Sequence, residues 1–98
     1  MTKAEVLARL RACEPEIRAL GVQRLSLFGS TARGEERPGS DVDLAAELRR
    51  DMRIGLVEYV DLEARLSEML GTKVDVVSEP ARHLHLQSRI DRDRIHVF

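Results

Sequence analysis

The pattern of apolar residues constrains the fold of this chain most, because its period changes several times along the sequence. Apolar side chains recur at steps of three and four in segments that are typical of helices. These helical segments are residues 3–20, 55–70 and 82–92. Alternating or β-branched runs, typical of strands, lie between and after them. These strand segments are residues 22–28, 41–48, 73–77 and 95–98.

The resulting order, α-β-β-α-β-α with a closing β, predicts an α+β (α/β-like) fold in which helices flank a small mixed β-sheet. Pro15 is expected to kink the first helical segment or to start a second short helix there. Gly21 and Gly71 are placed to end the helices that precede them. Residues 34–40 form the only loop-like cluster.

Length and charge narrow the possible classes of function. The 98 residues correspond to one domain, 1–98. Sixteen basic and 17 acidic side chains leave a net charge of −1, which argues against a general nucleic-acid-binding surface. Cys13 is the only cysteine, so no intrachain disulfide can form. No apolar run approaches the ~20 residues of a membrane span, and no signal-peptide core is visible, so we expect a cytoplasmic protein without a membrane partner.

The segment Leu-Phe-Gly-Ser-Thr-Ala-Arg-Gly, residues 27–34, has the features of a phosphate-binding turn. Gly29 and Ser30 lie where the first strand ends and a helical turn is expected to begin. Glycine allows a ligand to approach the backbone closely, and N–H groups at a helix start attract anions. Arg33 adds a positive charge one turn later, and Ser40 is a further candidate contact for phosphate.

Three aspartates predict a site for divalent cations. Asp41 and Asp43 are two residues apart on a predicted strand, so their carboxylates point the same way. Their mutual repulsion would be relieved by a hard cation such as Mg²⁺, and a pair of ions is expected. Asp75 lies in a valine-rich strand, where an unpaired carboxylate is costly. If that strand neighbours the first two aspartates, Asp75 joins them and is able to orient or deprotonate an attacking hydroxyl.

Simpler interpretations stay open for each of these residues. The aspartates at 41 and 43 would also suit a solvated strand face, and Asp75 would suit an edge strand that resists aggregation. Arg33 would also pair with Glu35 or Glu36, and Ser40 would also serve as a turn residue. The histidines are expected to have surface, partner-contact or structural roles rather than to bind metal. They are His83, His85 and His96.

The run from Gly29 to Gly34, followed by Ser40-Asp41-Val42-Asp43-Leu44, resembles the signature of the DNA polymerase β-like nucleotidyltransferases. In size and layout the chain is most similar to the minimal nucleotidyltransferases (MNT), the antitoxins of HEPN–MNT toxin–antitoxin pairs. The resemblance implies that Asp41, Asp43 and Asp75 bind divalent metal and that Gly29 and Ser30 contact the phosphates of ATP. It further implies that AMP is placed on a tyrosine of a HEPN ribonuclease partner.

Two other functions remain compatible with the sequence. In the first, the chain neutralises a toxin by binding and masking it, without catalysis. In the second, it transfers a nucleotide to a small molecule such as an antibiotic. An RNA acceptor is disfavoured by the near-neutral charge. Because few residues remain outside the predicted catalytic elements, acceptor recognition is expected to come from a bound protein or from a small molecule in the cleft.

Overall fold

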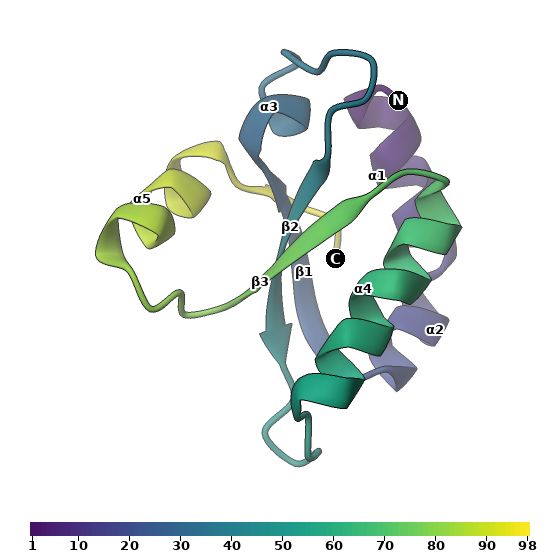
Figure 1. Ribbon diagram of the computed structural model, residues 1–98, viewed down its shortest axis with the longest axis vertical. Coiled ribbons are helices and arrows are strands. Elements are labelled where there is room, and N and C mark those ends of the chain that lie inside the picture. The colour runs from purple at the N-terminus through teal and green to yellow at the C-terminus, as the bar shows by residue number, and fades with distance from the viewer.

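The helices and strands follow the order predicted from the sequence, in a computed structural model that describes residues 1–98 (Figure 1). The helices are α1 (Lys3–Ala12), α2 (Glu14–Ala19), α3 (Gly29–Ala32), α4 (Leu56–Leu70) and α5 (Leu84–Asp93). The strands are β1 (Val22–Phe28), β2 (Val42–Leu48), β3 (Val74–Ser78) and β4 (Ile95–His96). The observed bounds differ from the predicted ones by one or two residues, as is usual at element ends.

Local sequence explains where the helices begin and end. Thr2 and Glu5 form a capping box at the start of α1. Pro15 lies in the first turn of α2, where its missing N–H costs little, so the chain starts a second helix there instead of kinking one. Gly71 ends α4 in the left-handed conformation, with φ of 71°. No helix combines the length and apolar composition that a membrane span requires.

The four strands form one mixed sheet in the order β3-β2-β1-β4. β1 pairs antiparallel with β2 and with β4, whereas β2 and β3 run parallel. A parallel pair needs a crossover connection, and α4 provides it. This arrangement confirms the predicted mixed sheet flanked by helices.

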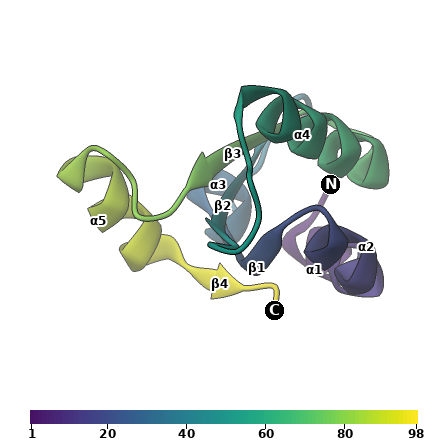
Figure 2. The ribbon, with the colours of Figure 1, turned by 90° about the horizontal axis from the view of Figure 1, so that it is seen from below.

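The sheet has one fully covered face and one partly covered face. Figure 2 shows α1, α2 and α4 on one side and α5 alone on the other. The main core of 16 buried residues includes Leu10, Leu27, Leu44, Leu66 and Val76. On the opposite face, a cluster of Phe28, Ala45 and Ile90 fixes α5 against the sheet. That face is therefore only partly covered, and polar side chains of β2 and β3 lie on it.

Side chains of α4 cover the free edge of β3. The backbone N–H groups of Val74 and Val76 donate to Ser67 Oγ (3.0 Å) and Glu63 Oε2 (2.9 Å). The hydroxyl of Tyr59 donates to the carbonyl oxygen of Val76. Exposed strand edges tend to pair with other chains. Here side chains of helix α4 bond the free N–H and C=O groups at this edge, and they hold β3 in register beside β2.

Candidate active site

Asp43 and Asp75 lie side by side on neighbouring strands. In the parallel β2–β3 pair, Asp43 is the direct partner of Asp75, flanked by the pairs Val42–Val74 and Leu44–Val76. Directly paired residues of adjacent strands point to the same face of a sheet. Both aspartates are half-buried, whereas the flanking valines and leucine enter the main core. The expectation that Asp75 reaches the face of Asp43 is confirmed.

Asp41 lies immediately before β2, not within it as the sequence pattern predicted. Its carboxylate Oδ2 is 3.6 Å from Nζ of Lys73, in the residue before β3, and the pair is exposed. The structure contains no group of three or more His, Cys, Asp or Glu side chains placed closely enough to hold a metal ion. Metal binding by all three aspartates therefore stays a prediction, and it requires Asp41 to turn from Lys73 toward Asp43.

The electrostatics of Asp43 suit a cation-binding role. Burial raises the pKa of its carboxyl group, and the nearby charges of Asp75 and Asp41 raise it further. Arg89 and Arg33 act in the opposite direction. A partly buried carboxylate beside two others binds cations readily, because a cation relieves both the repulsion and the loss of solvation. The chemistry of this donor set, hard oxygen ligands, fits Mg²⁺.

The turn after β1 packs directly against the Asp43 carboxylate. Gly29 has a φ of +79°, and a Cβ added there would overlap Oδ2 of Asp43 and lie 3.2 Å from its Cγ. Only glycine fits this position, both in conformation and in space. No side chain caps α3, which starts at Gly29, as a turn that receives an anionic ligand requires. Ser30 follows in this turn and is partly exposed.

Arg33 and Ser40, the other predicted phosphate contacts, are both engaged within the chain. Arg33 forms ion pairs with Glu35 (3.1 Å) and with Asp93 at the end of α5 (2.7 Å). The pairing with Glu35 is one of the simpler interpretations that the sequence left open. Ser40 Oγ accepts a hydrogen bond from the backbone N–H of Arg37 at 3.0 Å, in a turn. Phosphate binding by either residue stays a prediction.

The ion pair between Arg33 and Asp93 is expected to stabilise the fold. The Asp93 side chain is 3% exposed, so its carboxylate depends on its two arginine partners, Arg33 and Arg92. We expect Arg33→Gln to lower the midpoint of thermal unfolding by a few degrees. Arg49→Gln is the matched control, because the ion pair of Arg49 with Asp51 is exposed on both sides. Equal melting curves for the two variants would contradict a structural role for Arg33.

Arg89 was missed by sequence reasoning. It belongs to the charged run 89–94, which resembles an ordinary solvated surface. The structure places it on α5, directly before Ile90, which is buried against the sheet. Its positive charge lowers the pKa of Asp43. No local signal marks this residue, because only the packing of α5 brings it to the face that carries the aspartates.

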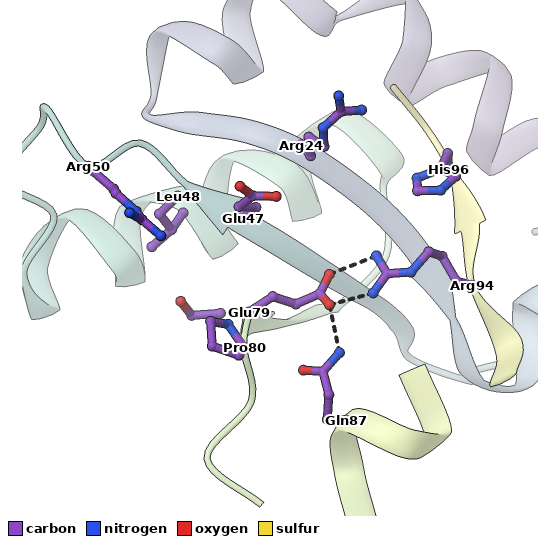
Figure 3. Close-up of a pocket in the computed structure, with 10 residues that line it drawn as sticks. Arg24, Glu47, Leu48, Arg50, Glu79, Pro80, Gln87, Arg94 and His96 are labelled. Carbon is purple, nitrogen blue, oxygen red and sulfur yellow. Dashed lines mark hydrogen bonds and ion pairs between the residues drawn. The ribbon is translucent and has the colours of Figure 1, made fainter. Parts of the chain in front are cut away.

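A cavity of about 490 Å³ lies farther along the same face of the sheet (Figure 3). Glu47 lines it, four residues beyond Asp43 on the same side of β2. Arg94 and Glu79 form an ion pair in its wall, and Gln87 donates to Glu79 at 2.8 Å. The hydrogen bond from Arg94 lowers the pKa of Glu79. This cavity is separate from the aspartates, and its ion pair connects α5 to the segment after β3.

The three histidines lie in or after the segment that leads into α5 and at β4. His83 precedes α5 without capping it through its side chain, and His85 is exposed. His96 lines the cavity, with Nδ1 3.5 Å from Ser26 Oγ. None of them belongs to a group of three or more His, Cys, Asp or Glu side chains placed closely enough to hold a metal ion.

Comparisons of sequence point to a single family. The profile of the nucleotidyltransferase domain family matches residues 10–97. The protein adenylyltransferase MntA of Thermococcus cleftensis is 30% identical over 98 residues, which cover 99% of this chain and 97% of that relative. A candidate protein adenylyltransferase of Methanocaldococcus jannaschii is 38% identical over 78 residues, or 80% of this chain and 82% of the relative.

Solved structures agree with the sequence comparisons. A candidate minimal nucleotidyltransferase superposes with a TM-score of 0.80 at 33% identity, over 97% of this chain and 95% of the other. The MNT antitoxin complex with a tri-AMPylated HEPN toxin from Shewanella oneidensis has a TM-score of 0.65 at 18% identity. That alignment covers 90% of this chain and 68% of the other, and it shows a shared fold.

Proposed function

The chain belongs to the nucleotidyltransferase domain family, and from that premise we propose that it is an antitoxin that transfers AMP from ATP to a tyrosine of a HEPN ribonuclease partner. One observation carries the proposal: Asp43 and Asp75 are paired in register beside a glycine turn that touches Asp43. Two carboxylates next to an uncapped turn are what a metal-bound triphosphate needs. The names of the relatives support a protein acceptor.

Each predicted site residue has a role in this proposal. Asp41, Asp43 and Asp75 would hold two Mg²⁺ ions, which when bound supply charge stabilisation for phosphoryl chemistry. The backbone at Gly29 and Ser30 would receive the phosphates of ATP, with Arg33 and Ser40 at the borders of that turn.

The transfer itself follows from these positions. The acceptor hydroxyl oxygen forms a bond to the α-phosphorus of ATP, and the bond from that phosphorus to pyrophosphate breaks. Asp75 orients the hydroxyl and accepts its proton. The pairing of the half-buried Asp75 with Asp43 supports this role, because Asp43 is the carboxylate that lies against the glycine turn.

The acceptor is proposed to be a protein because matching relatives of this chain are named protein adenylyltransferases. The net charge of −1 gives no general attraction to nucleic acid. Recognition of the acceptor then depends on the partner's own surface. We propose a hetero-oligomer with the toxin, in which the partner presents its tyrosine at the open face of the sheet.

The experiment combines the protein with the product of the neighbouring gene, Mg²⁺ and ATP labelled at the α-phosphate. We expect label on the neighbour, at a tyrosine identified by mass spectrometry, and loss of its ribonuclease activity. The double variant Asp41→Asn/Asp43→Asn should transfer no label. If the folded double variant still neutralises the toxin fully, masking by binding is the mechanism. Label on a small molecule but never on protein would identify a small-molecule transferase.

A further inference from the structure

Arg89 is a free cation on helix α5. Its guanidinium forms no ion pair, in contrast to Arg33, Arg92 and Arg94, which each bind carboxylates. It is exposed, although the next residue, Ile90, is fully buried against Phe28 and Ala45. The backbone of Arg89 is therefore fixed close to the sheet while its side chain is available to a ligand.

The helical period shows which flank of α5 carries Arg89. Successive residues turn by about 100° around a helix axis. The residues directed at the sheet and at α3 lie together on one side of α5, and they are Leu86, Ile90 and Asp93. Arg89 lies about 70° from the centre of that side on this period, at the border between the covered stripe and solvent.

The opposite flank of α5 is occupied by the cavity network. Gln87 and Asp91 lie on it and make hydrogen bonds within or beside the cavity, together with Arg94 in the residue after α5. Gln87 and Arg94 both donate to Glu79 (Figure 3). They also donate to Asp91. Because this flank faces the cavity, Arg89 on the other flank is directed toward the end of the sheet where the paired aspartates lie.

Besides Lys73, which pairs with Asp41, the other cation near this end of the sheet is Arg33, and it is already bound. Its partners are Glu35 and the buried Asp93, the last residue of α5. The ion pair with Asp93 connects α3 to α5, so Arg33 positions the helix that carries Arg89. The free positive charge that faces the aspartates is thus the one on α5.

We propose that Arg89 binds the β- and γ-phosphates of the nucleoside triphosphate and stabilises the pyrophosphate leaving group. This proposal rests on the proposed function and adds a phosphate ligand to it. When the bond between the α-phosphorus and its bridging oxygen breaks, both electrons pass to pyrophosphate. A guanidinium beside that group compensates the added negative charge, and its planar fork matches phosphate oxygens.

The test measures nucleotide binding by calorimetry, with Mg²⁺ and the non-hydrolysable analogue AMP-PNP. We expect Arg89→Gln to weaken AMP-PNP binding about tenfold, which is a modest value for a lost charge-assisted hydrogen bond to phosphate. AMP lacks the two outer phosphates, so its affinities for the parent and for the variant should agree within about twofold. That difference is well below the tenfold loss expected for AMP-PNP, which corresponds to 1.4 kcal/mol. Arg89→Lys should restore part of the affinity, because the charge is kept and the bidentate geometry is lost.

Arg65→Gln is the matched control. It removes the same charge from α4, on the opposite side of the sheet, where Arg65 is exposed. Equal AMP-PNP affinity in the parent and in Arg89→Gln would overturn the role of Arg89. An equal loss for AMP and AMP-PNP would also overturn it, because the effect would not depend on the outer phosphates. Failure of the parent to bind AMP-PNP would instead reject the proposed function, so the two failures are distinguishable.

Discussion

Asp43→Asn is expected to abolish nucleotidyl transfer and, at the same time, to raise the melting temperature of the metal-free protein. Metal-held phosphoryl transfer depends on several kcal/mol of charge stabilisation, so we expect at least about a thousandfold loss of rate. The measurement is transfer from α-labelled ATP, together with melting curves in the presence of a chelator. Mg²⁺ should raise the melting temperature of the parent and leave that of the variant unchanged.

The stability increase follows from the direction of the pKa shift. Burial, Asp75 and Asp41 raise the pKa of Asp43 in the folded state above its unfolded value. The folded state then binds more protons than the unfolded state between the two values, so stability falls as pH rises through that window. Asparagine has no charge to lose. The free energy of unfolding of the variant should therefore exceed that of the parent by an amount that grows from acid toward neutral pH and is still present at pH 7.

Asp61→Asn is the matched control for this prediction. Asp61 is exposed on α4 and forms a weak ion pair with Arg65 at 3.5 Å, so its replacement should change neither activity nor the pH dependence noticeably. A lower melting temperature for Asp43→Asn at pH 7 would show that Asp43 supports the fold instead of straining it. Retained transfer activity in that variant would remove Asp43 from the catalytic machinery.

Gly29→Ala is expected to inactivate the enzyme by displacing Asp43. The added Cβ would overlap Oδ2 of the Asp43 carboxylate. Because a misplacement of about 1 Å can cost a hundredfold in rate, we expect a loss of at least that size. The left-handed φ of +79° adds strain of roughly 1 kcal/mol for any residue with a Cβ.

Gly34→Ala separates the clash from the strain. Gly34 has a φ of +73°, close to that of Gly29, and a Cβ added there meets nothing within 4 Å. This control should lose a similar roughly 1 kcal/mol of stability and keep most of its activity. Transfer assays and melting curves on both variants distinguish the effect of the clash from the effect of the backbone strain. If both lose activity equally, the contact between Gly29 and Asp43 is not what the site requires.

The local pattern of the sequence was sufficient for much of the fold. Helical and strand periods along the chain predicted every major element, because amphipathic spacing is a property of neighbouring residues. The same local logic placed Gly29 at a strand-to-helix turn and Asp43 within the strand that follows. The alternating pattern placed the start of β2 one residue too early, at Asp41, because strand ends depend on pairing partners and not on alternation alone.

What the sequence determined by itself was the set of elements and the spacing of Gly29, Asp41 and Asp43, since these depend on residues close together in the chain. The tertiary structure was needed to show that Asp75 faces Asp43, that Arg33 binds Asp93, and that Arg89 lies near enough to Asp43 to lower its pKa. Each of these relations joins segments that are 30 or more residues apart. They are fixed by strand order and by the packing of α5, which no local pattern encodes.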